Sequence, residues 1–175
     1  MYLYVTSDVV GVQSGGGRVT QEEMVALDSI AKDGLMVIHS GEYPELRNPD
    51  PFKADEFALG LIQEWSSKGK SFQLAHFYAG CFSKTIKWLK FAQTPPCRVT
   101  YTAAAHDKDA SMEEFGKLGL EYPFQHIKNS TLWEHYLVGY KLADVLICPS
   151  TYSADLMTSY GCGRSGMRVI PHGVD

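Results

Sequence analysis

The stretch YLYVTSDVVGVQSGGGRVTQEEMVALDSIAKDGLMVIH, residues 2–39, decides the fold of this chain. It opens on a run of aromatic and β-branched residues, 2–6, that predicts a short buried strand. A glycine loop at 14–18 follows, and apolar residues then recur at helical spacing. The run 35–39 predicts a second buried strand. Strand, glycine loop, helix and strand in this order begin a βαβ unit, whose crossover is nearly always right-handed.

The helix of this unit has one apolar face, and we expect that face to lie against the sheet. Its members are Met24, Leu27, Ile30 and Ala31, and the charged residues off that face are Glu22, Glu23 and Asp28. The adjacent pair Glu22 and Glu23 therefore predicts a solvated surface. Neighbouring helical residues point in different directions, so the pair does not suit acid–base catalysis.

The alternation of strands and helices continues to the end of the chain. Further strands are expected at 72–76, 98–102, 144–148 and 167–170, and further helices at 57–68, 79–91, 109–118, 128–142 and 153–160. Continuously apolar strands that alternate with helices indicate a parallel sheet covered on both faces. The predicted fold is a single α/β domain over 1–175, with an open, doubly wound, mostly parallel sheet of the Rossmann-like kind.

Composition excludes several classes of function. Sixteen basic and twenty acidic side chains give a formal charge of -4, which does not provide the basic face that a nucleic acid requires. The four cysteines form no CxxC pair, and no cluster of cysteine and histidine has zinc-ligand spacing, so we expect no metal site. No cofactor is expected either. No signal peptide and no membrane-spanning run is visible. Reduced cysteines in apolar surroundings are typical of a cytoplasmic protein.

Gly15, Gly16, Gly17 and Arg18 make the first candidate site. Glycines let backbone N–H groups approach a ligand, and a loop before a helix suits a phosphate or another anion. The motif is neither GxGxxG nor a Walker A sequence. The alternative is a connection whose glycines only allow a turn. The position after the first strand of a doubly wound sheet favours the binding site.

Further candidates follow other predicted strands, where open parallel sheets bind their ligands. His106 and Asp107 come after the strand at 98–102, and His76 ends the strand at 72–76. For each histidine, the alternative is a loop or structural residue without a catalytic role. Ser150 follows the strand at 144–148, where either it or Thr151 is expected to cap the next helix, and Ser150 could also contact a ligand.

Four segments, in order, resemble the N-terminal domain of family 4 glycosyltransferases, a retaining group with the two-domain GT-B architecture. They are SGGGR at 14–18, RVTYT leading to His106-Asp107, LADVLICPS at 142–150 and RVIPHGVD at 168–175. The last two are the most specific, and the resemblance covers the whole chain.

The resemblance implies that two domains bind the two substrates. The N-terminal domain binds a sugar-containing acceptor, and a C-terminal domain outside this chain binds a nucleotide-diphosphate sugar as donor, without an obligatory metal. Gly16 and Gly17 match the glycine loop near the donor phosphates, His106 matches the histidine that contacts the transferred sugar, and Asp175 closes the turn that opens the interdomain linker. We therefore expect the isolated domain to be inactive.

Two other readings of the sequence remain open. One is a non-catalytic module that binds a sugar or sugar phosphate, or a subunit completed by a separate donor-binding chain. The other is a nucleotide-binding regulator with a doubly wound fold. Peripheral membrane contact is a further expectation, because the segment 82–91 carries three lysines that could lie on an anionic surface. More often such a helix covers the sheet.

Overall fold

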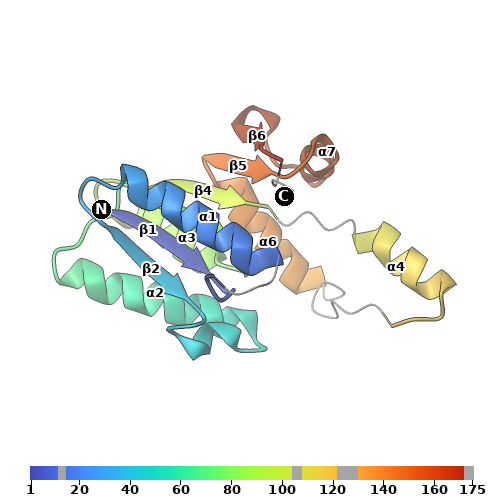
Figure 1. Cartoon of the computed structure of the whole chain (residues 1–175), viewed down its shortest axis with the longest axis horizontal. Coiled ribbons are helices and arrows are strands. Elements are labelled where there is room, and N and C mark those ends of the chain that lie inside the picture. The colour runs from blue at the N-terminus through green and yellow to red at the C-terminus, as the bar shows by residue number, and fades with distance from the viewer. Residues whose placement is uncertain (12–14, 104–107, 122–129, 172–175) are drawn as a thin grey trace.

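A computed structural model describes residues 1–11, 15–103, 108–121 and 130–171. Within these residues, six strands form one sheet with the order β2-β1-β3-β4-β5-β6, and every neighbouring pair is parallel. The strands are β1 (Tyr2–Thr6), β2 (Leu35–His39), β3 (Leu74–Tyr78), β4 (Arg98–Thr102), β5 (Val145–Cys148) and β6 (Met167–Val169). The predicted doubly wound, Rossmann-like α/β fold is confirmed (Figure 1).

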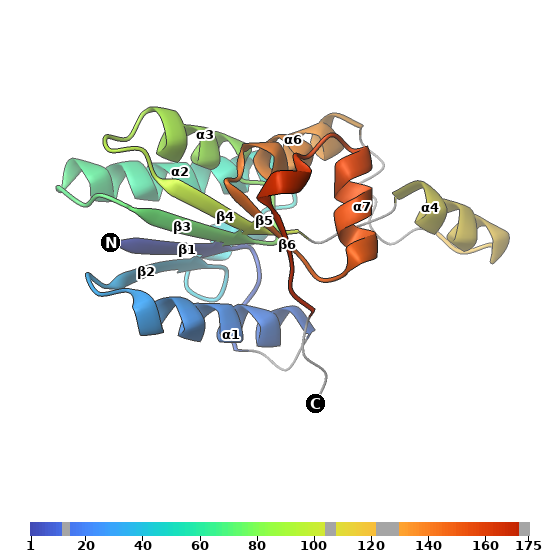
Figure 2. The same ribbon diagram turned by 90° about the horizontal axis from the view of Figure 1, so that it is seen from above.

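Helices cover both faces of the sheet. They are α1 (Gly15–Ile30), α2 (Pro51–Ser67), α3 (Ser83–Phe91), α4 (Lys108–Lys117), α6 (Ser130–Leu142) and α7 (Thr151–Ser159), with 3-10 turns at Pro44–Arg47 and Arg164–Gly166. Helix α1 lies on one face, and α2, α3 and α6 lie on the other (Figure 2). Helix α7 packs at the β5–β6 edge. Helix α4 lies at one end of the molecule, where its Met112 and Phe115 pack against Trp133.

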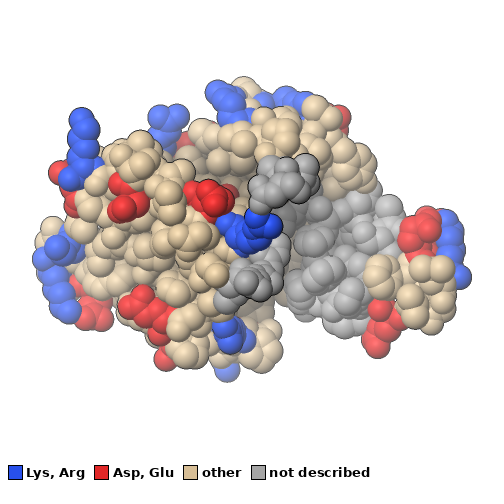
Figure 3. Space-filling view, viewed as in Figure 1, with Lys and Arg blue, Asp and Glu red and all other residues tan. Residues whose placement is uncertain are grey.

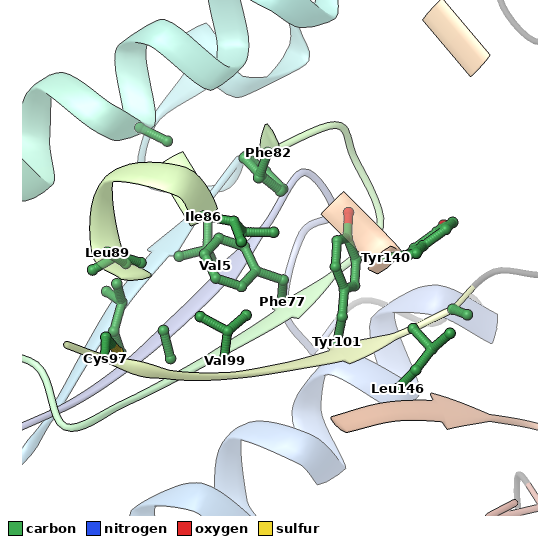
Figure 4. Packing of buried hydrophobic residues seen from close by; sticks show 14 of the residues in the cluster. Val5, Phe77, Phe82, Ile86, Leu89, Cys97, Val99, Tyr101, Tyr140 and Leu146 are labelled. Atoms are coloured by element: carbon green, nitrogen blue, oxygen red, sulfur yellow. The ribbon is translucent and has the colours of Figure 1, made fainter. Parts of the chain in front are cut away.

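The face covered by α2, α3 and α6 holds the hydrophobic core. Val5, Phe77 and Tyr101 are neighbours in register across β1, β3 and β4, and all three are buried. Helix α3 packs Ile86 and Leu89 into the same cluster (Figure 4). Full burial of each large apolar side chain contributes roughly 1.5–3 kcal/mol. The core on this face therefore fixes the sheet and the ends of its strands.

The face covered by α1 is polar, which the sequence analysis did not predict. Tyr4, His76 and Thr100 are neighbours in register there, and Thr102 lies one row further on. Helix α1 places Glu23 against them, with only 18% of the Glu23 side chain exposed. The expectation that Glu23 lies in solvent was wrong, because a polar sheet face selects a polar partner on the helix.

The side of α1 that faces the sheet differs from the apolar face predicted from the sequence. Ile30, expected in the core, is 55% exposed, whereas Thr20 is fully buried. The Thr20 hydroxyl satisfies its hydrogen bond inside the helix by donating to the Gly17 carbonyl at 2.9 Å. The face of α1 that packs against the sheet therefore contains both polar and apolar residues, and polar residues make contacts with the sheet.

Strand β3 begins two residues later than the sequence predicted. Phe72 exchanges its backbone hydrogen bonds with the side chain of Gln93, at 3.1 Å to Oε1 and 2.7 Å from Nε2. This side chain substitutes for a neighbouring strand, so the ladder starts only at Leu74, opposite Tyr2 and Arg98. The shift matters for function, because the residue at the carboxyl end of β3 is Tyr78 and not His76.

Helix α3 also begins later than predicted, at Ser83. The buried Asp55 of α2 accepts hydrogen bonds from the backbone N–H groups of Lys84 and Thr85 at 2.8 and 3.0 Å. A carboxylate at a helix N-terminus satisfies amides that have no intrahelical partner. The residues before Ser83 are thereby left to form the loop at the end of β3.

Two lysines of α3 are engaged in ion pairs. Lys84 pairs with Glu56 at 2.5 Å, and Lys90 with Asp144 at 2.6 Å. Basic and acidic side chains are interspersed on the face shown in Figure 3. None of the helices in the described part of the chain is both long and apolar enough to cross a bilayer.

Candidate functional site

The strand order reverses at the boundary between β1 and β3. The chain passes from β1 through α1 to β2 on one side, and it builds β3 to β6 on the other. In doubly wound sheets, ligands bind outside the carboxyl ends of the strands at such a switch point. Here the loop after β1, the carboxyl end of β3 and the first turn of α1 meet at this position. We refer to Asp8, Gly16 and Tyr78, one from each element, as the switch-point site.

Gly16 brings the first turn of α1 close to the loop after β1 and to the carboxyl end of β3. A Cβ on Gly16 would lie 2.4 Å from Oδ2 of Asp8 and 3.7 Å from the hydroxyl oxygen of Tyr78. Real Cβ atoms essentially never approach another heavy atom within 3.0 Å. Glycine is therefore the residue that allows helix, carboxylate and phenol to share this space.

Asp8 is held by its backbone, and its carboxylate faces the switch point. Its N–H donates to Oγ1 of Thr6 at 3.0 Å, and its carbonyl accepts from Ser40 N at 3.3 Å. The carboxylate accepts no hydrogen bond from, and forms no ion pair with, any residue in the described part of the chain. Partial burial raises the pKa of this carboxyl above its ordinary value.

Tyr78 supplies a hydroxyl at the same point. Burial, together with the nearby charges of Asp8 and Glu23, raises the pKa of Tyr78 to about 12. The phenol is therefore protonated at neutral pH and can donate a hydrogen bond. The Asp8 carboxylate can accept hydrogen bonds and the Tyr78 phenol can donate one, and these are contacts that hydroxyl groups of a polar ligand make.

The turn after Tyr78 is tightly packed against the core. Ala79 and Gly80 both have positive φ, 47° and 87°. A Cβ on Gly80 would lie 2.7 Å from Phe82 and 3.1 Å from Oγ of Ser7. Only glycine fits this conformation and this space without strain. The Gly80 carbonyl accepts a hydrogen bond from the Tyr101 hydroxyl at 2.5 Å, which ties the turn to the core.

A buried polar network lies beneath the switch-point site. Glu23 accepts from the Tyr4 hydroxyl at 2.9 Å and from the Thr102 hydroxyl at 2.6 Å. His76 Nε2 lies 3.2 Å from the same carboxylate, and His76 Nδ1 lies 2.7 Å from Oγ1 of Thr100. The His76 ring stacks on Tyr4 with centroids 5.6 Å apart. These contacts join α1 to β1, β3 and β4.

The glycine motif lies in the helix and not in a loop ahead of it. Gly15, Gly16 and Gly17 form the first turn of α1, although the sequence predicted a helix from Val19. The Gly17 carbonyl accepts from Gly11 N at 3.1 Å, which holds this turn against the loop after β1. Arg18 is exposed.

The other candidates lie at different places. His76 is central in β3 and 4% exposed, within the polar network. Ser150 follows β5, and its Oγ accepts from Ser153 N at 3.1 Å, which confirms the predicted N-cap of α7. His106 and Asp107 lie outside the described residues. The last described residue before them, Ala103, is bound to β5 by its N–H, 2.9 Å from the carbonyl oxygen of Ile147.

Sequence reasoning missed Asp8, Tyr78 and Glu23. Asp8 stands two residues after the first predicted strand, at the position that the switch-point rule favours. Tyr78 was missed because β3 ends two residues later than predicted, which makes Tyr78 its last residue. The alternation Val99-Thr100-Tyr101-Thr102 was the signal for a polar sheet face, because successive residues of a strand point to opposite sides.

The chemistry that the described residues offer is one of hydrogen bonding. Among them, no group of three or more histidine, cysteine, aspartate or glutamate side chains is arranged to hold a metal ion. A carboxylate, a phenol and a helix N-terminus at one point can orient a polar substrate. They include no activated nucleophile.

Comparison with known proteins gives this site a context. Residues 18–175 match the family model described as Glycosyltransferase Family 4. A search of curated proteins gave no match. The family match begins within the first turn of α1 and covers every element that follows it. Together with the parallel Rossmann-like sheet, it shows that the chain belongs to glycosyltransferase family 4 and has the fold of the N-terminal domain of its GT-B enzymes.

Proposed function

We propose that this domain is the acceptor-side half of a retaining glycosyltransferase. The enzyme would transfer a sugar from a nucleotide-diphosphate sugar to an acceptor hydroxyl. The convergence of Asp8, Gly16 and Tyr78 at the switch point of a family 4 domain carries the proposal. Carbohydrates present many hydroxyl groups, and a site built from hydrogen-bonding groups on rigid strand ends can orient them.

The reaction requires groups on both sides of a cleft. The bond between the anomeric carbon and the donor phosphate breaks, and the nucleoside diphosphate leaves with the electron pair. The acceptor oxygen then bonds to the same carbon as its proton is released. Contacts that fix the sugar and donors directed at the departing diphosphate lower the barrier for this step.

We assign one wall of that cleft to the carboxyl edge of this sheet. His106 contacts the transferred sugar in this proposal, and it follows β4, two strands from β1. Gly15, Gly16, Gly17 and Arg18 line the same edge, since they begin α1. Asp107 follows β4 in the sequence and Ser150 follows β5, and both remain candidates for acceptor contacts. His76 supports the wall from beneath and does not reach the ligand.

A second, donor-binding domain completes the cleft in this proposal. The described residues offer no cluster of basic side chains at the switch-point site that would bind a diphosphate, and the nearest carboxylate, that of Asp8, repels one. The donor must therefore be held mainly by groups from elsewhere. Four free, buried cysteines support a reducing, cytoplasmic setting.

The test is a transfer assay on the complete gene product, with everything that its reading frame encodes. Nucleotide sugars are screened by release of nucleoside diphosphate, with and without a mixture of sugar acceptors. We expect acceptor-dependent release with at least one donor, and no release with the 175-residue domain alone. If the complete product releases no nucleotide from any donor but binds sugars, the domain is a binding module. Turnover by the isolated domain would contradict the proposed division of labour.

A further inference from the structure

We propose that helix α1 opens as a separate unit, because the Glu23 carboxylate and not the hydrophobic core docks it on the sheet, and that Glu23 is thereby a positioning residue for the switch-point site. The docking of α1 concerns the fold of this chain alone. The positioning role rests on the proposed function and deepens it, because Gly16 belongs to the first turn of the same helix.

The apolar residues of α1 contribute little to its docking. Within the described part of the chain, no residue of α1 belongs to the core cluster, either among its buried members or among the partly buried residues packed against it. Val25 and Ile30 are 52% and 55% exposed, and Met24 and Leu27 are only partly buried. The hydrophobic stabilisation that holds α2 and α3 on the other face is therefore small for α1.

The polar contacts of α1 are buried and come from one side chain. The Glu23 carboxylate accepts from the Tyr4 hydroxyl at 2.9 Å and from the Thr102 hydroxyl at 2.6 Å, and it lies 3.2 Å from Nε2 of His76. Burial and the charge of Glu23 raise the pKa of Tyr4 far above its ordinary value, so this hydroxyl remains a donor. Hydrogen bonds to a charged group are about twice as strong as neutral ones. Glu23 thus holds the helix through partners on three strands.

The surface beneath α1 can be exposed to water at a lower cost than the opposite face of the sheet. Tyr4, His76 and Thr100 lie in register on the side of α1, and each carries a polar group that water can satisfy when the helix leaves. On the other face, an opening would expose the apolar side chains of Val5 and Phe77. Opening of α1 therefore requires less free energy than opening of α2 or α3.

The first turn of α1 depends on this docking for its place. Residues 15–17 are glycines, and glycine is the poorest helix former after proline. The Gly17 carbonyl accepts from Gly11 N at 3.1 Å, which ties the turn to the loop after β1. A helix of 16 residues that begins on three glycines is marginal on its own in water. The switch-point site, which includes Gly16, therefore forms when Glu23 docks the helix.

Hydrogen exchange of the 175-residue protein in low concentrations of urea tests the docking. Amides at 20–27 in α1 are compared with amides at 58–64 in α2, because both sets lie inside their helices and do not report fraying ends. In the wild type, the α1 amides should exchange roughly tenfold faster or more, with a weaker dependence on urea, since less surface is exposed when α1 opens alone. Equal rates with equal urea dependence would overturn the inference, because α1 would then open only with the whole fold.

Three variants identify what docks the helix. Glu23→Gln should raise the exchange rate of the α1 amides about tenfold, because a charged acceptor is lost. Glu22→Gln, at the exposed neighbouring position, should leave that rate unchanged. Ile62→Val removes a methyl group from the core beneath α2. It should raise the exchange rate of the α2 amides about fivefold and leave α1 unchanged, because Ile62 stays packed when α1 opens alone.

Two results of this series would contradict the docking by Glu23. One is an equal response of both helices to Ile62→Val, which would show that α1 and α2 open together. The other is an α1 exchange rate that does not respond to Glu23→Gln. The core variant decides the question even if Glu23→Gln does not fold.

Kinetics of the complete gene product separate positioning from stability. We expect Glu23→Gln to lower kcat/KM roughly tenfold at a temperature where the variant is folded, and Ile62→Val to keep the wild-type value. Equal losses in both variants would overturn the positioning role, because Glu23 would then act through stability alone. If the wild type transfers no sugar, the proposed function and the positioning role both fall, and the exchange data still decide how α1 is docked.

Discussion

Glu23 of α1 lies 3.2 Å from Nε2 of His76, in the middle of β3. The same carboxylate accepts hydrogen bonds from Tyr4 of β1 and Thr102 of β4. One side chain thus joins a helix to three strands of the sheet. Because Gly16 stands two turns earlier on that helix, the Glu23 contacts also set where the first turn of α1 meets Asp8.

We expect Glu23→Gln to destabilise the protein by about 1–3 kcal/mol, because an amide cannot accept through both of its terminal atoms and leaves a buried partner unsatisfied. Unfolding in urea, monitored by circular dichroism, measures the change. Glu22→Gln is the matched control, since Glu22 is the exposed neighbour on the same helix and should shift stability by no more than about 0.5 kcal/mol. Equal effects of the two variants would show that the network contributes nothing.

The four thiols should be unreactive in the folded protein. Burial is the main cause that raises the pKa of Cys81 and of Cys97 to about 12 and that also raises the pKa values of Cys148 and Cys162. At pH 8, a thiol with a pKa of about 12 is ionised in roughly one molecule in ten thousand, and the thiolate is the reactive form.

A chromogenic disulfide reagent checks this expectation. In urea, where the pKa values return to about 8.5, all four thiols should react within the mixing time. In buffer, labelling should proceed no faster than the protein unfolds. Rapid reaction of even one thiol under native conditions would mean that its surroundings are more open or more positively charged than described.

His106→Ala in the complete gene product should lower kcat by roughly a hundredfold, the magnitude typical for loss of one preorganised donor to a transition state. The KM for acceptor should change far less, because His106 contacts the transferred sugar in this account. Steady-state kinetics with varied acceptor separate the two constants. An unchanged kcat would show that His106 is not part of the site. A rise in KM alone would show that His106 binds the acceptor.

The sequence predicted all six strands within two residues, because each is a short apolar run between helical segments. It also located the edge of the sheet where a site could form. It placed His76 wrongly at a strand end, because the Gln93 side chain satisfies the backbone of Phe72 in place of the ladder. A contact across 21 residues of sequence is not visible in local periodicity.

The inward direction of Glu23 was missed for a related reason. A prediction from helical periodicity places the apolar residues on the buried side of the helix and the polar residues in solvent. Here the sheet face itself is polar, through His76, Thr100 and Thr102, so a glutamate is the complementary choice. The convergence of Asp8 and Tyr78 on Gly16 depends on two tight turns and a helix start, and it could be found only with the fold in hand.

The most direct measurement is the transfer rate of Gly16→Ala beside Gly60→Ala in the complete gene product. An added Cβ at Gly16 meets Oδ2 of Asp8 at 2.4 Å, whereas at Gly60 in α2 it meets nothing within 4 Å. We predict that Gly16→Ala folds but loses roughly ten- to a hundredfold in kcat/KM, because it displaces the Asp8 carboxylate from the site. Gly60→Ala should keep the wild-type rate. A folded Gly16→Ala with a wild-type rate would show that transfer does not take place at this edge of the sheet.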